Sequence, residues 1–227
     1  MKLIVLLLIP LLISSCNFSR PMQKGYYDKP TTLGIVFTVL PKFGQYPNNN
    51  YGLSAVGAAG NLIEDGVQKK RNKNISDSIL ISDVFITMKK SLWESFGARG
   101  KKVKIIQGNI NVEELVSLQV EGNFYPYFIK DYCKANGVDE LLVIDVVEYG
   151  LWGSGKDLYA YINASPYIVE GKSNQYLWRL TIPKGRFTSA ITGEWKKRPS
   201  AEEYAYALQN AFEFTKYMIF KDLDKNQ

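Results

Sequence analysis

The chain of 227 residues contains no histidine and only two cysteines, Cys16 and Cys133. The absence of histidine excludes Ser-His-Asp and Cys-His catalytic groups and every metal site with a histidine ligand. Two cysteines are too few for a four-cysteine zinc site. Apolar residues make up 46% of the chain and charged residues 22%, which excludes a chain that is disordered throughout. We therefore expect a folded domain that holds neither a metal nor another cofactor.

The amino-terminal end also lacks an apolar run long enough to span a bilayer. Lys2 precedes an apolar run at residues 3–13, which is about half of the roughly 20 residues that a transmembrane helix needs. A positive start, a short apolar stretch and small residues at the cleavage site are typical of a secretory signal peptide. The pattern predicts that the leader is removed and that the protein is exported.

The residues at the expected cleavage site are more specific. Ile13-Ser14-Ser15-Cys16 resembles the bacterial lipobox, which is an apolar residue, two small residues and an obligatory cysteine. The resemblance implies that residues 1–15 are a lipoprotein signal peptide and that Cys16 is acylated with membrane lipid. An ordinary signal peptide with an incidental cysteine is the alternative. Asn17 stands where an inner-membrane retention signal usually has Asp, which favours a lipoprotein of the outer membrane that faces the periplasm.

The formal net charge of the chain is +6, and removal of Lys2 with the leader lowers it to +5. Export argues against a nucleic acid as the partner of this basic chain. An anionic lipid surface or an acidic partner protein suits the charge better. Residues 16–32 carry prolines, glycine and charges without periodicity, so they are predicted to form a lipidated tether that precedes a single domain at 33–224.

Hydrophobic periodicity predicts an α/β domain with a single mixed sheet of about five strands and helices packed on it, in the order β-α-α-β-α-β-β-β-α. Strands are predicted at 33–40, 103–107, 140–149, 158–169 and 176–182. Helices are predicted at 52–68, 81–96, 111–121, 126–136 and 200–221, and the order counts 111–121 and 126–136, which Gly122 separates, as one helical region. The helix at 81–96 has an apolar stripe at Val84, Phe85, Met88, Leu92 and Phe96, and the last helix has one at Tyr204, Leu208, Ala211, Phe212, Thr215 and Ile219.

The segment 52–60 is rich in glycine and alanine, which allow backbones to approach closely. Three interpretations stay open. The segment could belong to a helix that packs on the sheet, it could form a contact between two copies of the chain in a homo-oligomer, or it could insert into a membrane.

Two patterns could indicate chemistry. Residues Gly150–Lys156 have the spacing of a phosphate-binding loop, but Asp157 replaces the Ser or Thr that would hold Mg²⁺, and a strand rather than a helix is predicted to follow. We interpret the segment as a hairpin loop without nucleotide affinity. Asp145 and Glu148 are the best carboxylate pair, but on a regular strand they would point to opposite faces. Cys133 lies in an apolar stretch and is predicted to be buried and unreactive.

Aromatic residues cluster in the region of the last three strands. Core packing explains most of them, but exposed members would form an interaction surface, for which Trp152, Tyr159 and Tyr161 are the candidates. Such a surface could contact another envelope protein, or it could line a pocket for a small molecule or a glycan.

A short turn adds a resemblance to a known group of proteins. Residues Ala135–Val143 read Ala-Asn-Gly-Val-Asp-Glu-Leu-Leu-Val. They resemble the Gly-Ala-Asp-x-Leu-Leu-Val turn of periplasmic lipoproteins built on the amino-terminal domain fold of TolB and of curli-secretion-type lipoproteins. The order of elements from Leu33 to Asp224 is similar as well, although segment 52–60 and the aromatic loops depart from it. The resemblance implies a domain that acts through protein contacts in an envelope assembly, and it transfers no functional residue.

The sequence thus predicts a lipid-anchored envelope protein that is not an enzyme and that binds an unidentified envelope protein. The alternative is a lipoprotein that binds a small molecule or a glycan, and an envelope hydrolase is the third possibility.

Overall fold

The computed structural model describes residues 20–41, 44–47, 81–120, 122–154, 157–180, 187–191 and 201–227. The predicted signal peptide at 1–15, Cys16 and the small-residue segment 52–60 lie outside these ranges. No helix within the described ranges is both long and apolar enough to cross a membrane.

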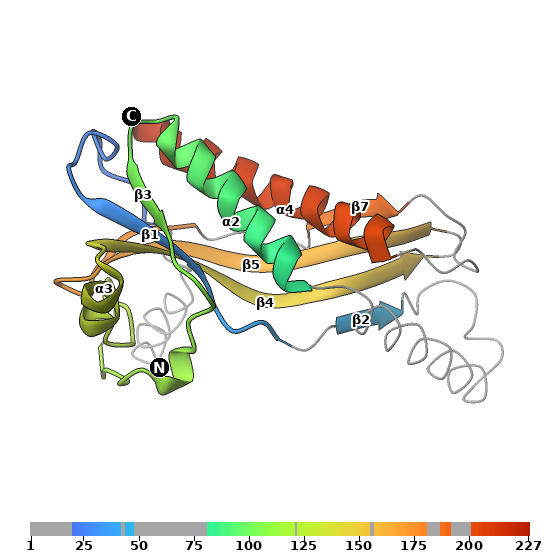
Figure 1. The fold of residues 1–227 in the computed structure, drawn as a ribbon, viewed down its shortest axis with the longest axis horizontal. Coiled ribbons are helices and arrows are strands. Elements are labelled where there is room, and N and C mark those ends of the chain that lie inside the picture. Colours follow the sequence, from blue (N-terminus) through green and yellow to red (C-terminus); the bar gives the residue numbers. More distant parts are fainter. Residues whose placement is uncertain are drawn as a thin grey trace, which may run out of the picture.

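One mixed β-sheet forms the centre of the described structure (Figure 1). Five strands follow one another in the order β3-β1-β4-β5-β6, while β2 pairs with β4 and β7 pairs with β5. The strands are β1 (Thr32–Phe37), β2 (Gly44–Pro47), β3 (Lys102–Ile105), β4 (Glu140–Ser154), β5 (Asp157–Glu170), β6 (Tyr176–Arg179) and β7 (Phe187–Ile191). β1 pairs in parallel with β3 and β4, whereas β5 pairs antiparallel with β4, β6 and β7. The predicted α/β class with a mixed sheet is confirmed, and β2 and β7 are additional strands.

Two long helices, α2 (Ile81–Gly97) and α4 (Ala201–Leu223), lie side by side on one face of the sheet (Figure 1). The apolar stripes predicted for both helices are buried against residues of β1, β4 and β5. Phe37 of β1 lies at the centre of this contact, because its ring centroid is 5.2 Å from that of Phe85 on α2 and 5.8 Å from that of Phe212 on α4. Helix and sheet therefore share one continuous apolar core.

The opposite face is covered by α3 (Lys130–Asn136) and by the irregular segment 106–129. The prediction of a helix at 111–121 is wrong, because the described residues of this segment form only the single 3₁₀ turn η3 (Val112–Glu114). The backbone then turns back on itself, with Leu118 N donating to Pro126 O at 2.7 Å and Phe128 N donating to Val116 O at 2.9 Å. These bonds to a later segment replace the bonds that a helix would have formed.

Asn174, in the turn between β5 and β6, holds this irregular segment in place. Its side-chain amide donates to Tyr125 O at 2.7 Å and to Tyr127 O at 2.9 Å, and its side-chain oxygen accepts from Ile129 N at 3.1 Å. Asn174 has a φ of 62°, in the left-handed region that asparagine tolerates better than most residues. One buried side chain thus satisfies three backbone groups that no strand partner reaches.

Residues 20–31, which were predicted as part of a tether, pack on the domain instead. Arg20 pairs with Arg179 beside β6, and Met22 and Tyr26 are buried in the core under α2 and α4. The Tyr26 hydroxyl donates to Glu140 Oε2 at 2.7 Å, and the Lys101 ammonium lies 3.3 Å from the same oxygen. The domain therefore begins by residue 20, because aromatic burial and a buried ion pair outweigh the loop-like composition of this segment.

Candidate functional site

The three residues of the predicted interaction surface lie on the hairpin of β4 and β5. Trp152 pairs directly with Tyr159, and Tyr161 pairs with Gly150, so the strand register places all three positions on one face. Tyr161 is 0% exposed, however, and Tyr159 is half-buried. Tyr161 therefore cannot contribute to an exposed surface, and this part of the prediction is wrong. The Trp152 side chain lies outside the described part of the structure, as does Cys16.

The glycine-rich segment is part of the same hairpin. Gly150–Ser154 belong to β4, and β5 begins at Asp157. A phosphate-binding loop leads into a helix whose amino-terminal N–H groups bind the phosphate, whereas a strand follows here. Most of the segment predicted as a loop is therefore strand, although another strand follows it, as predicted. Gly155 and Lys156 lie outside the described residues.

The prediction that Asp145 and Glu148 point to opposite faces is wrong. A β-bulge at Val147 shifts the register of β4, so that Asp145 pairs with Ser165 and Glu148 pairs with Asn163. Ser165 and Asn163 are two positions apart on β5, so both carboxylates lie on one face of the sheet. Asp145 is half-buried, and burial raises the pKa of its carboxyl group. Glu148 is also half-buried, and it accepts a hydrogen bond from Asn163 Nδ2 at 3.3 Å.

Cys133, on α3, is buried as predicted. Burial, with a smaller effect of Asp139, raises the pKa of its thiol to about 12, so the reactive thiolate is scarce at neutral pH. A Cβ atom on Gly171 would lie 2.7 Å from the Cys133 sulfur, so the end of β5 passes very close to α3 here.

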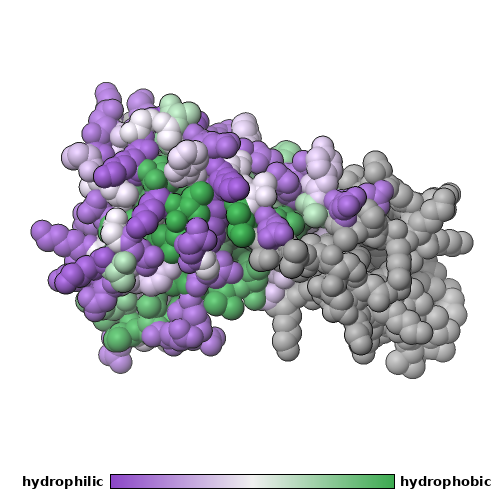
Figure 2. All heavy atoms as spheres, viewed as in Figure 1, coloured by the Kyte–Doolittle hydropathy of each residue, from purple (hydrophilic) through white to green (hydrophobic). Residues whose placement is uncertain are grey.

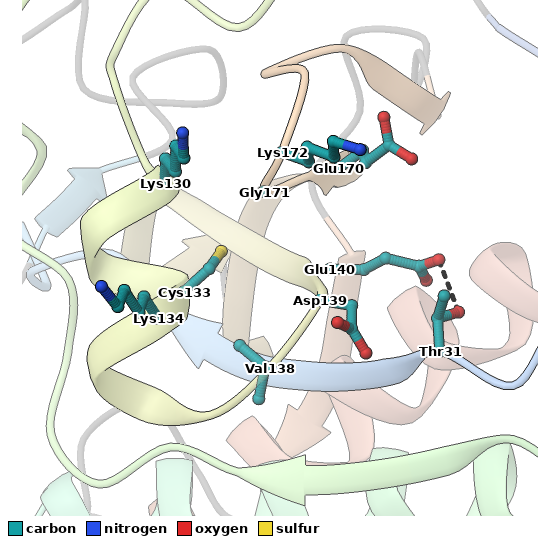
Figure 3. Close-up of a pocket in the computed structure, with 10 residues that line it drawn as sticks. All are labelled: Thr31, Lys130, Cys133, Lys134, Val138, Asp139, Glu140, Glu170, Gly171 and Lys172. Carbon is teal, nitrogen blue, oxygen red and sulfur yellow. Dashed lines mark hydrogen bonds between the residues drawn. The ribbon is translucent and has the colours of Figure 1, made fainter.

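A cavity of about 450 Å³, which we call the polar cavity, opens beside α3 where β1 and β4 begin and β5 ends (Figure 3). Its lining combines small or apolar groups with charged residues of both signs. The residues are Thr31, Lys130, Cys133, Lys134, Val138, Asp139, Glu140, Glu170, Gly171 and Lys172.

The carboxylates of the polar cavity are all engaged by the chain itself. Asp139 accepts from the backbone N–H of Thr32 at 2.8 Å, Glu140 accepts from the Thr31 hydroxyl at 2.7 Å, and Glu170 accepts from the Ser173 hydroxyl. In Figure 3 the Lys134 ammonium points away from Asp139 and Glu140. Each carboxylate of the polar cavity therefore already has a hydrogen-bond donor from the chain itself. Within the described ranges, no three Cys, Asp or Glu residues lie close enough together to hold a metal ion.

Three large aromatic side chains are exposed on the outer side of α4, opposite its buried stripe. Tyr206 is 69% exposed, Phe214 is 59% exposed and Tyr217 is 56% exposed. A helix has about 3.6 residues per turn, so positions 206 and 217 are almost three full turns apart and lie on the same side. The rings of Phe214 and Tyr217 meet edge to face, with centroids 6.4 Å apart. We call these residues the α4 aromatic stripe. The spacing of these three aromatic residues is visible in the sequence and is a signal that could have identified the stripe.

The chain has no match among protein-family models or curated proteins. Among solved structures, it is similar to the lipoprotein GNA1162 from Neisseria meningitidis at 12% identity and a TM-score of 0.36, covering 82% of this chain and 99% of that one. A neuraminyllactose-binding hemagglutinin homolog from Helicobacter pylori has 14% identity and a TM-score of 0.30, with 92% and 91% covered. The protein CT253 from Chlamydia trachomatis has 8% identity and a TM-score of 0.34, with 86% and 99% covered. TM-scores this low do not establish a common fold, and these similarities carry no information about function.

Proposed function

We propose that the chain is a lipoprotein of the bacterial cell envelope, anchored through Cys16, that works through contacts with another envelope protein and not by catalysis. The sequence Ile13-Ser14-Ser15-Cys16 supports the anchor. Stable anchoring takes two or more acyl chains, which a fully acylated amino-terminal cysteine would carry. Asn17, which stands where an inner-membrane retention signal usually has Asp, supports a position on the periplasmic side of the outer membrane.

The α4 aromatic stripe is the observation that carries the proposed protein contact. Isolated exposed apolar residues are ordinary on protein surfaces, but three large aromatic side chains on one side of a helix are not. Aromatic side chains supply much of the binding energy in protein interfaces, because they cover a large area and lose little conformational freedom. The opposite side of α4 is fixed in the core, so the stripe is presented on a rigid element.

The absence of catalysis is part of the proposal. The polar cavity offers ionisable groups, but its three carboxylates hold Thr31, Thr32 and Ser173 of the chain itself. The high pKa of Cys133 argues against a thiol nucleophile there.

The anchor is tested by the variant Cys16→Ser in cells that are labelled with a radioactive fatty acid. We expect the unaltered protein to take up label and the variant to remain an unlabelled precursor. Uptake of label by the variant would show that the anchor lies elsewhere.

The protein contact is tested by replacing Tyr206, Phe214 and Tyr217 together with serine. A matched control replaces Phe124 and Phe128, which are exposed on the other side of the sheet, with serine. Both variants are crosslinked in intact cells, and the captured proteins are quantified by mass spectrometry. We expect the stripe variant to fold and to lose a protein that the control still captures, whereas an unchanged set of captured proteins would argue against this surface.

A second copy of the chain is the alternative partner. Light scattering of the purified protein distinguishes a second copy from a different partner protein. If the stripe binds a second copy, the unaltered protein forms an oligomer and the stripe variant does not.

A further inference from the structure

A second cavity, of about 430 Å³, lies between α2 and the segment that follows β3. We call it the α2 cavity. Its volume falls in the range of about 300–1,000 Å³ that is typical of small-molecule sites. Figure 2 shows hydrophobic residues exposed among hydrophilic ones in the region where Figure 1 places α2 and β3. The apolar and aromatic part of the cavity wall consists of Leu40, Phe85, Ile86, Ile105, Ile106 and Tyr149.

A lysine on the buried side of α2 supplies the polar end of this cavity. Lys89 is only 4% exposed, and its ammonium donates to Ile106 O at 3.0 Å and to Gly108 O. An ammonium group has three N–H donors, so two backbone carbonyls leave one donor without an acceptor among the described residues.

The charge of Lys89 is not neutralised by the chain as described. No carboxylate within the described residues forms a salt bridge with Lys89, and the cavity lining contains a second lysine, Lys90, and no acidic residue. The lining of the polar cavity differs, because it contains three carboxylates as well as three lysines. A buried charge without a partner is costly, so an anion that enters the α2 cavity would gain from completing the pair.

Burial lowers the pKa of Lys89 to about 8, which leaves its amine mostly protonated at neutral pH. The charged form is therefore present to meet an anion, although its surroundings disfavour it. A buried group that binds an anion must keep its charge and still gain from meeting the anion, and Lys89 meets both conditions.

We propose that the α2 cavity binds a small amphiphilic carboxylate, with its head group on the free N–H of Lys89 and its apolar tail against Phe85, Leu40 and Tyr149. One carboxylate matches one buried ammonium, and an aliphatic tail matches the apolar wall. The site goes beyond the proposed protein contact and does not depend on it, because no residue of α4 lines this cavity.

Calorimetric titration of the full-length protein in detergent micelles with octanoate tests the proposal. We expect saturable binding at one site per chain and at least tenfold weaker binding of octan-1-ol, which has the tail without the charge. Lys89→Met should weaken octanoate binding at least tenfold. Lys102→Met removes an exposed lysine of β3 outside the cavity and should leave binding within about threefold.

Ile86→Trp keeps Lys89 and narrows the mouth of the cavity, since Ile86 is exposed at its edge. This variant should also bind octanoate at least tenfold more weakly. If Lys89→Met fails to fold, the result for Ile86→Trp decides whether octanoate binds in the α2 cavity. Absence of octanoate binding, equal binding of octan-1-ol, or unchanged binding by a folded Lys89→Met or Ile86→Trp variant would overturn the proposal.

Discussion

Two long helices cover one face of the sheet, whereas one short helix and an irregular segment cover the other. On the face of α2 and α4, apolar side chains at helical spacing meet apolar side chains of the strands. On the face of α3, Tyr125, Tyr167 and Tyr176 pack with their rings in contact, and the buried hydroxyl of Tyr167 donates to that of Tyr125 at 3.0 Å.

The difference shows that the two faces are stabilised by different means. The helical face depends on the volume and area of apolar side chains, so removal of any large member leaves a cavity. The α3 face has an apolar core of its own, but its irregular segment is also held by directed hydrogen bonds, above all those of Asn174. Loss of these bonds should therefore loosen one segment while the rest stays folded.

The largest expected effect is that of Phe212→Ala on α4. Phe212 is fully buried, and its ring meets that of Phe37. Replacement of a core phenylalanine by alanine costs about 3–5 kcal/mol in the free energy of unfolding, a large part of a typical total of about 5–15 kcal/mol. Urea denaturation measures the loss.

Phe214→Ala is the matched control, because it removes the same atoms from the exposed side of the same helix. It should change the free energy of unfolding by no more than about 0.5 kcal/mol. Equal losses in the two variants would mean that the helical face is not held by apolar burial.

Asn174→Ala should cost about 2–4 kcal/mol, because three backbone groups, two of them buried, lose their partners and alanine is strained at a positive φ. Asn174→Gly relieves the strain and should recover about 1 kcal/mol of this loss. Hydrogen exchange should quicken at Tyr125 and Ile129 in both variants and stay slow in the middle of α4. Uniform loss of protection would show that the two faces do not differ as described.

Lys89 is an exception to the comparison, because it places a charged group at the apolar face of α2. Its pKa is about 8 in the folded protein and about 10.5 in the unfolded chain. Between these values the unfolded chain binds more protons, so stability must rise with pH. From pH 8 to pH 10 we expect the free energy of unfolding to gain about 2 kcal/mol relative to Lys89→Met.

The variant Lys89→Met serves as the reference because Tyr149 also lines the α2 cavity, and burial raises the pKa of Tyr149. The contribution of Tyr149 is common to both proteins and cancels in the difference. If the free energy of unfolding changes with pH in the same way in the two proteins, Lys89 does not carry a buried charge without a partner.

Among the changes to buried residues, Tyr167→Phe should have the smallest effect. It removes one hydroxyl donor and leaves the ring in place, so the cost should be about 1 kcal/mol by thermal or urea denaturation. A cost as large as that of Phe212→Ala would mean that this one hydrogen bond contributes as much to the free energy of unfolding as a core phenylalanine, which would contradict the description of the two faces.

The helical face could be predicted from the sequence, whereas on the α3 face the helix could be predicted but the irregular segment could not. The stripes of α2 and α4 follow the 3.6-residue period, which is written in consecutive residues. The contacts of Asn174 join residues that are 45 to 49 positions apart, and no local pattern reports them. The bulge at Val147 likewise changes which face Glu148 occupies without a residue that marks it.

The candidate sites were only partly visible in the sequence. Lys89 lies between Phe85 and Leu92 on the apolar side of α2, and a lysine at such a position is a signal that could have been noticed. Met22 and Tyr26 lie among prolines and glycines, and composition alone gave no reason to expect them in the core. The polar cavity needs β1, β4, β5 and α3 together, so its geometry follows from the fold alone.

The most direct test of the proposed protein contact places a photoreactive phenylalanine analogue at Tyr217 of the full-length protein in intact cells. The same analogue at Phe124 is the control, because this aromatic position is exposed on the other side of the sheet. We predict that irradiation gives a discrete crosslinked product with another envelope protein from Tyr217 and not from Phe124. A crosslink from Phe124 alone, or none from either position, would contradict the account.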